Sequence, residues 1–174
     1  MTADEIIAQA EDYAKSYNEP SVAPFPHQLV LANKRDLEIV HADLEDDSLA
    51  GAILYKDDKF TILINVAKSA RVQNVTLGHE LGHYALHAPL VKERKAILDN
   101  DDFVKWAAVS FLPEDRQAFR TEVEANLFAL HLLMPADLVK RGWEVTRNVQ
   151  ELAKIFKVTT VAMSQRLTEM GLVK

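Results

Sequence analysis

The chain has 174 residues, a formal net charge of −6 and no cysteine. Its length suits one well-buried core, and its 48% hydrophobic and 26% charged residues are ordinary for a globular protein. The lack of cysteine excludes disulfides, a thiol nucleophile and a thiolate metal site, so a bound metal would need histidine and carboxylate ligands.

The charge and hydropathy also bear on partners and location. A negative net charge disfavours a nucleic-acid backbone as the main partner. No segment approaches the ~20 continuous apolar residues that a membrane span needs. The first residues lack the basic start and apolar run of a secretory signal. We therefore expect a cytoplasmic protein with no membrane contact; its oligomeric state does not follow from the sequence.

Helical spacing begins at the N-terminus. Thr2 and Glu5 have the spacing of a capping box, and apolar residues then recur on one helical face. This pattern predicts a helix over residues 3–17. Residues 19–26 contain three prolines, which indicates an irregular connector.

Strand character follows the connector. Three short runs are candidates for strands: 37–42, 52–56 and 60–66. The polar residues 56–59 between the last two suit a hairpin tip. We expect these runs to form a small antiparallel sheet.

Helices dominate the remainder of the predicted fold. Two long helices are expected at 69–87 and from about 113 to 134, and a charged stretch at 91–113 suits a helix or an irregular lid. Three shorter helices are predicted at 136–140, 149–156 and 160–170. The predicted class is α+β, with the sheet packed on a mainly helical body around the helix at 69–87. We expect one domain over residues 1–135, with residues 136–174 packed on it.

An H-E-x-x-H motif lies in the middle of the helix predicted at 69–87. His79 and His83 are four residues apart, so their imidazoles lie on one helical face and can converge on one metal ion. Glu80 is rotated toward the open side of such a site, where it can take a proton from a metal-activated water. Without sulfur ligands, the set suits Zn²⁺ best.

A third protein ligand is expected on the downstream helix, where Glu122 and Glu124 are both candidates. Helical phase separates them. Glu122 shares a face with Asn126 and with Ala129, a small residue that would let the two helices approach closely. Glu124 lies on a different face, where a solvent-exposed acid is the simpler interpretation.

The residues around these positions resemble the ImmA/IrrE family of zinc metallopeptidases. The resemblance covers roughly residues 51–135 and rests on TLGHELGHYALH, on a preceding strand that ends in ILIN, and on E-x-E-A-N-x-F-A-x-x-L-L-M-P. It implies that Glu122 is the third ligand and that Asn126 hydrogen-bonds a ligand histidine. It also implies that the strand at 60–65 offers an edge to an extended substrate.

The predicted function is zinc-dependent hydrolysis of a peptide bond. The resemblance further implies a helix-turn-helix transcriptional repressor as the substrate, in a stress or mobile-element circuit. The alternative is a zinc-stabilised regulatory or toxin-like module that binds a partner without turnover. Residues 152–172 have the pattern of a helix-turn-helix with Arg166 exposed, so DNA binding is a third hypothesis.

Two further histidines have structural interpretations. His87 falls near the predicted end of its helix, where it can act as a C-terminal cap. His131 follows the phase of Glu124, which predicts a partly exposed position.

Overall fold

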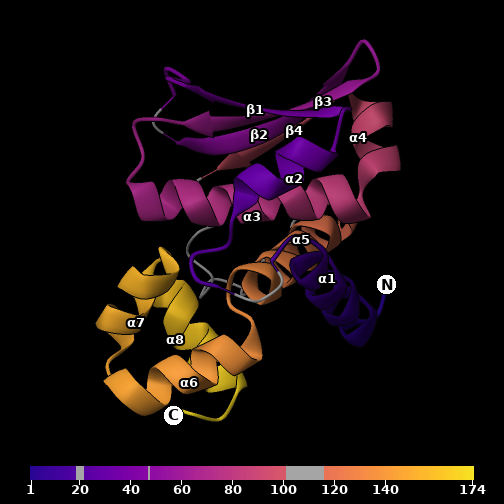
Figure 1. Ribbon diagram of the computed structural model, residues 1–174. Coiled ribbons are helices and arrows are strands. Elements are labelled where there is room, and N and C mark those ends of the chain that lie inside the picture. Colours follow the sequence, from indigo (N-terminus) through magenta and orange to yellow (C-terminus); the bar gives the residue numbers. More distant parts are fainter. Residues whose placement is uncertain (19–21, 47, 101–115) are drawn as a thin grey trace.

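The fold is a sheet covered on one face by helices (Figure 1). The computed structural model describes residues 1–18, 22–46, 48–100 and 116–174. The elements in chain order are α1 (Ala3–Tyr17), α2 (His27–Asn33), β1 (Leu37–Ala42), β2 (Leu49–Lys56), β3 (Lys59–Asn65), α3 (Ala70–Leu86), α4 (Ala88–Arg94), β4 (Ala96–Asn100), α5 (Arg116–Leu133), α6 (Ala136–Thr146), α7 (Val149–Phe156) and α8 (Thr160–Glu169). The α+β class predicted from the sequence is confirmed.

Side-chain caps fix the starts of several helices. Thr2 and Glu5 form the predicted capping box of α1. Ser69 Oγ accepts from the backbone N–H of Val72 at the start of α3. Asn148 and Thr159 cap α7 and α8 in the same way. Because each cap satisfies a backbone donor that the helix cannot, these short polar residues set where the helices begin.

The sheet is mixed, so the expectation of an antiparallel sheet was wrong in one pairing. The strand order is β1-β3-β2-β4, and β2 pairs antiparallel with both β3 and β4. β1 pairs parallel with β3, with Leu37 opposite Phe60. Since β2 lies between β1 and β3 in the chain, this pairing is non-local and leaves no signal in either strand. β3 is therefore a central strand, and the expectation that it offers a free edge was also wrong.

Two further elements were missed. α2 follows the proline-rich connector directly, with Pro26 at its N-cap position and Val30 buried. The stretch from residue 91, expected as a helix or an irregular lid, begins inside helix α4 and continues into strand β4, which is the second element missed. The rest of that stretch, and the expected helix start near residue 113, lie outside the described residues.

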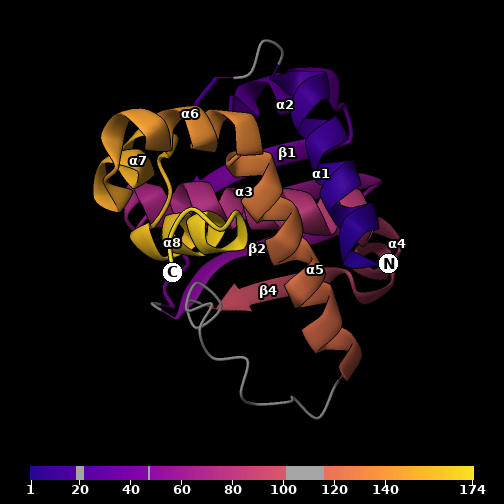
Figure 2. The same ribbon diagram turned by 90° about the horizontal axis from the view of Figure 1, so that it is seen from below.

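α3 and α5 cross in close contact beneath the sheet (Figure 2). A Cβ atom on Gly82 would lie 2.9 Å from the carbonyl oxygen of Ala125 and 3.0 Å from its Cα, so the two backbones touch at this point. A Cβ on Gly78 would instead meet the side chain of Leu133 at 2.8 Å. Only glycine at position 82 permits this crossing without moving a helix, and the crossing brings one face of α5 over the motif on α3.

The C-terminal helices pack against the end of α5 through a buried arginine. Arg166, which was expected to be exposed, is only 3% exposed. Its Nε donates to the carbonyl of Met134 at 3.1 Å, and its Nη1 donates to Glu169 at 2.9 Å.

In the described part of the chain, no helix combines the length and apolar character needed to cross a membrane.

Candidate metal centre

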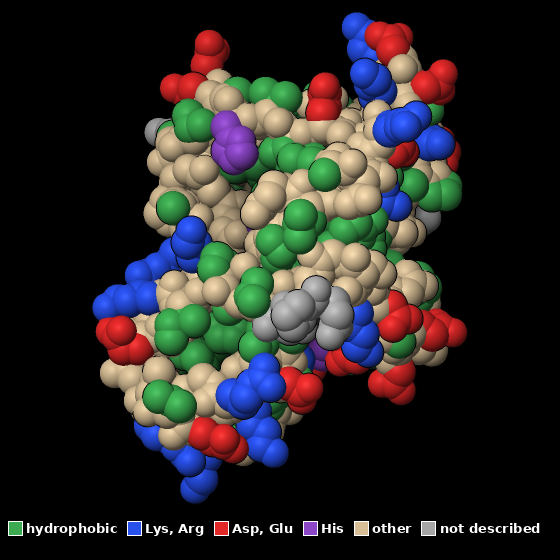
Figure 3. Space-filling model, in the orientation of Figure 1, with side chains coloured by type: hydrophobic (Ala, Val, Ile, Leu, Met, Phe, Trp, Pro, Cys, Tyr) green, Lys and Arg blue, Asp and Glu red, His purple; other side chains and the backbone are tan. Residues whose placement is uncertain are grey.

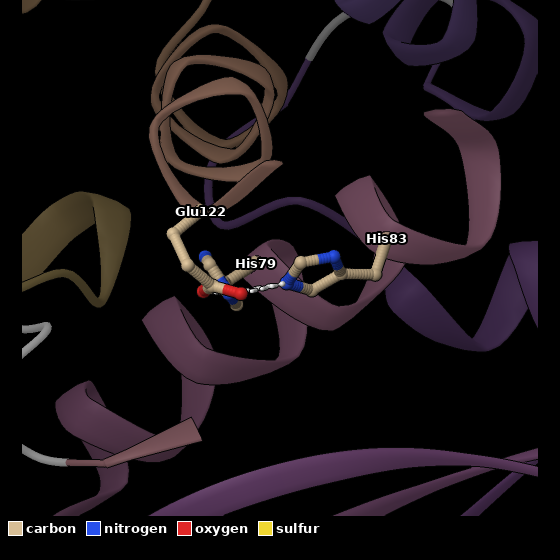
Figure 4. Close-up of side chains that lie close together, drawn as sticks. All are labelled: His79, His83 and Glu122. Atoms are coloured by element: carbon tan, nitrogen blue, oxygen red, sulfur yellow. Dashed lines mark hydrogen bonds and ion pairs between the residues drawn. The ribbon is translucent and has the colours of Figure 1, made fainter. Parts of the chain in front are cut away.

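His79, His83 and Glu122 converge at the crossing of α3 and α5 (Figure 4). The Nε2 atoms of the two histidines are 2.9 Å apart. The Glu122 carboxylate reaches from α5, with Oε2 3.2 Å from Nε2 of His79 and Oε1 3.5 Å from Nε2 of His83. The three side chains place one ligand atom each within 4.8 Å of one another, and such a group could hold a metal ion.

The donor set and its spacing fit a tetrahedral zinc site. Ligands at ~2.0 to 2.1 Å from Zn²⁺ in a tetrahedron lie ~3.3 Å from one another. The two Nε2 atoms are 2.9 Å apart, and each lies 3.2 or 3.5 Å from one of the two Glu122 oxygens, so the separations are close to that value. Two imidazole lone pairs at this distance repel one another, and a cation between them turns the repulsion into attraction.

Burial and charge set the protonation of these groups. Burial lowers the pKa of His83 to about 4, although the neighbouring Glu122 acts to raise it. Burial acts to raise the pKa of Glu122, but the hydrogen bonds and charges of His79 and His83 outweigh it and lower the pKa to about 2. At neutral pH His83 is therefore neutral and Glu122 is anionic, the forms in which both can coordinate a metal.

Among the three residues, Glu122 is the most exposed. His79 and His83 are buried, whereas the Glu122 side chain is 21% exposed. Glu80 is fully buried on the sheet side of α3. A Cβ atom on Gly51 of β2 would lie 3.3 Å from Oε1 of Glu80, so the carboxylate of Glu80 is held against β2.

Asn126 contacts the first histidine of the motif. Its Oδ1 lies 3.0 Å from Nδ1 of His79. A metal held at Nε2 of His79 would leave the ring proton on Nδ1, which would then donate it to the amide oxygen. This contact fixes the ring so that Nε2 points toward His83 and Glu122.

The sequence indicated that Glu124 is exposed and that His87 only caps the end of its helix. The structure differs on both points, because the two side chains contact each other in a buried position. Nδ1 of His87 lies 3.1 Å from Nδ1 of His83, and its Nε2 lies 3.0 Å from Oε2 of Glu124. Both side chains are nearly inaccessible, at 7% and 11% exposed. The backbone N–H of His87 does donate to the carbonyl of His83 at the end of α3. Continuation of the i, i+4 spacing from His83 to His87 was the available signal for the side-chain contact.

His131 is also buried, which corrects the expectation of partial exposure. It is 4% exposed, and its Nε2 lies 2.9 Å from Oε1 of Glu169. This histidine belongs to the Arg166 contact between α5 and α8 and does not approach the three-residue group.

A cavity of about 520 Å³ lies elsewhere, between α1 and the far end of α3. Tyr13, Lys34 and Tyr84 are among its lining residues, and none of His79, His83 and Glu122 lines it. The convergence of donor atoms therefore identifies the candidate site, and the size of a cavity does not.

The chain belongs to the peptidase M78 family, described as the IrrE N-terminal-like domain, whose model matches residues 32–168. A Mycobacterium tuberculosis transcriptional regulator has a similar structure, with a TM-score of 0.64 and 14% sequence identity. That likeness covers 94% of this chain and 47% of the regulator, so the chain spans about half the length of that protein. At this identity, the likeness shows a shared fold. No curated protein sequence matches the chain.

Proposed function

We propose that the protein is a zinc-dependent endopeptidase. The observation that carries this proposal is the convergence of His79, His83 and Glu122, two imidazoles and one carboxylate with ligand atoms within 4.8 Å of one another. Three protein ligands leave a fourth position open, as catalytic zinc sites require. Membership of a peptidase family supports the same reaction class.

The chain supplies the proton transfers. When bound, Zn²⁺ makes a water molecule acidic enough to act as a nucleophile near neutral pH and polarises the scissile carbonyl. Glu80 accepts the proton of the attacking water and returns it to the leaving amine. Its burial against Gly51 keeps competing water away from the carboxylate. Asn126 holds His79 in the tautomer that coordination needs.

The edge of the sheet near Glu80 is β4, and we propose that the substrate chain pairs there. β4 is an outer strand of the described sheet, and Asp99 lies opposite Gly51, the β2 residue against Glu80. An extended peptide added to β4 would place its backbone beside the candidate site. Because a strand pairs through every second residue, N-methylation along a substrate peptide should impair cleavage at alternate positions. Equal effects at consecutive positions would exclude strand pairing.

The proposed substrate is a helix-turn-helix transcriptional repressor. This part rests on the resemblance of the motifs to ImmA/IrrE peptidases and on family membership. The fold shared with a transcriptional regulator is in keeping with a regulatory setting. The proposed location, the cytoplasm, is where such a repressor acts.

Exchange of Glu80 for glutamine tests the enzyme against a module that only binds. We expect Glu80→Gln to retain zinc and lose cleavage of a candidate repressor by a factor of about 100 or more, the contribution typical of a general base. Glu93→Gln, an exposed exchange on α4, is the matched control and should cleave normally. Full regulatory function of the Glu80→Gln protein would favour binding without turnover.

DNA binding by the C-terminal helices is the less favoured alternative. Residues 136–174 contain seven Lys and Arg against four Asp and Glu, and Figure 3 shows blue side chains around this end of the molecule. However, Arg166 is the one basic residue of α8 and it is buried. A recognition helix without a free cation has little to offer a phosphate backbone, so we expect no salt-dependent DNA gel shift.

A further inference from the structure

A chain of hydrogen bonds runs from the candidate metal centre to a second acid on α5. Nδ1 of His83 contacts Nδ1 of His87 at 3.1 Å, and Nε2 of His87 contacts Oε2 of Glu124 at 3.0 Å. The other carboxylate oxygen of Glu124 accepts from Nε of Arg120 at 2.9 Å. α5 thus contributes Glu122 to the centre itself and Glu124 to the far end of this chain.

The direction of each hydrogen bond follows from the metal-facing nitrogen. Nε2 of His83 points at His79 and Glu122, so a metal ligand at this atom must keep its lone pair free and carry its proton on Nδ1. That proton can only be donated to His87, whose Nδ1 must then be the acceptor. His87 therefore carries its own proton on Nε2 and donates it to Glu124, which as a carboxylate accepts only.

We propose that His87 and Glu124 are positioning residues that hold His83 in its metal-binding tautomer and orientation. The proposal rests on the metal centre proposed above. His79 has a neutral amide, Asn126, on its outer nitrogen, whereas His83 has an imidazole backed by a carboxylate. The carboxylate at the end of the chain accepts from the ring that contacts His83, an arrangement that fixes the orientation of a metal-binding imidazole.

A purely structural role for His87 would not need this chain. As the C-cap of α3, His87 uses only its backbone N–H, which donates to the carbonyl of His83. Its two ring nitrogens are both engaged on buried partners from different helices. Because one of these partners is the candidate ligand His83, breaking the chain should act on zinc affinity as well as on stability.

The test measures zinc affinity by chelator competition, together with thermal stability. We expect His87→Phe to weaken zinc binding about 10- to 100-fold, the usual effect of losing a residue that orients a ligand. Glu124→Gln keeps an acceptor oxygen but removes the charge, so it should weaken binding less. Because the two residues act in series, the double variant should bind zinc no more weakly than His87→Phe alone.

A second histidine–glutamate pair, in which the histidine is buried and the glutamate is exposed, provides a control. His131 and Glu169 are 2.9 Å apart, almost the same as the 3.0 Å between His87 and Glu124, but they have no contact with the metal-site histidines. Glu169→Gln and His131→Phe should lower thermal stability and leave zinc affinity unchanged. Equal effects of the two pairs on zinc affinity would show that general destabilisation, and not positioning, is responsible.

Nitrogen NMR of the unmodified, zinc-loaded protein tests the same proposal without a variant that must fold. We expect that His83 carries its proton on Nδ1. We expect that His87 carries its proton on Nε2 and that its Nδ1 is unprotonated. A proton on Nδ1 of His87 would overturn the proposal, as would wild-type zinc affinity in both His87→Phe and Glu124→Gln. Absence of zinc binding by the wild-type chain would instead contradict the proposed metal centre itself, so the two failures can be told apart.

Discussion

Buried histidines in this chain differ in what their two ring nitrogens touch. His79 and His83 direct Nε2 toward Glu122, which makes them candidate ligands. His87 and His131 use Nε2 to contact Glu124 and Glu169. The sequence predicted the first pair because H-E-x-x-H is a local pattern on one helix. The sequence could not predict that His87 contacts Glu124 or that His131 contacts Glu169. Helical phase gives the face on which a residue lies, but it does not give the side chain that packs against that face.

His27 is expected to make stability depend on pH. Its Nε2 contacts Asn74, and burial lowers its pKa to about 4. Since the unfolded chain takes up this proton near pH 6.5, the stabilisation is fully present above that pH and is lost as the pH falls toward 4. The loss is at most about 3 kcal/mol. In denaturant titrations, His27→Gln should show a smaller fall in stability between pH 7 and pH 5 than the wild type. Parallel curves would contradict this.

At the scale of elements, the starts of helices could be predicted from residues close to them in the sequence, whereas the pairing of distant strands could not be predicted. The capping box of α1 and the Ser69 cap of α3 lie within a few residues of the helices they start. α2 was missed because its N-cap, Pro26, was read as part of the connector, although proline suits the start of a helix. The parallel β1–β3 pairing depends on how the hairpin folds over β1, which no local pattern encodes.

The approach of α3 to α5 is expected to control metal binding. In Gly82→Ala the new methyl group would meet the backbone of Ala125, so α5 must shift and carry Glu122 away from the histidines. In Gly78→Ala the methyl group meets the side chain of Leu133, which can rotate. We predict a loss of zinc affinity of more than tenfold for Gly82→Ala, the cost of a misplaced ligand, and a small loss for Gly78→Ala. Similar zinc affinities in the two variants would contradict the close crossing.

At the scale of the whole molecule, we propose that residues 1–135 and 136–174 form one cooperative unit. The family match runs across this boundary, from residue 32 to 168. Arg166 ties α8 to the end of α5 by bonding the carbonyl of Met134. The His27–Asn74 contact extends this connection, because Asn74 also donates to the carbonyl of Lys157.

Removal of the Arg166 side chain tests this unity. Arg166→Met leaves the Met134 carbonyl and His131 without a charged donor, and should destabilise the protein by about 2 to 3 kcal/mol. Thermal unfolding followed by circular dichroism measures the shift. Lys154→Met, an exposed exchange on α7, is the control and should change stability little. An unchanged melting temperature for Arg166→Met would mean that the C-terminal helices do not depend on this contact.

Metal content tests the central claim most directly. Elemental analysis of protein purified without chelator should give about one zinc per wild-type chain and a large loss in Glu122→Ala. Val123→Ala, at the exposed position next to Glu122, should retain the wild-type content. Equal zinc in Glu122→Ala and the wild type, or no zinc in either, would contradict a centre built from His79, His83 and Glu122.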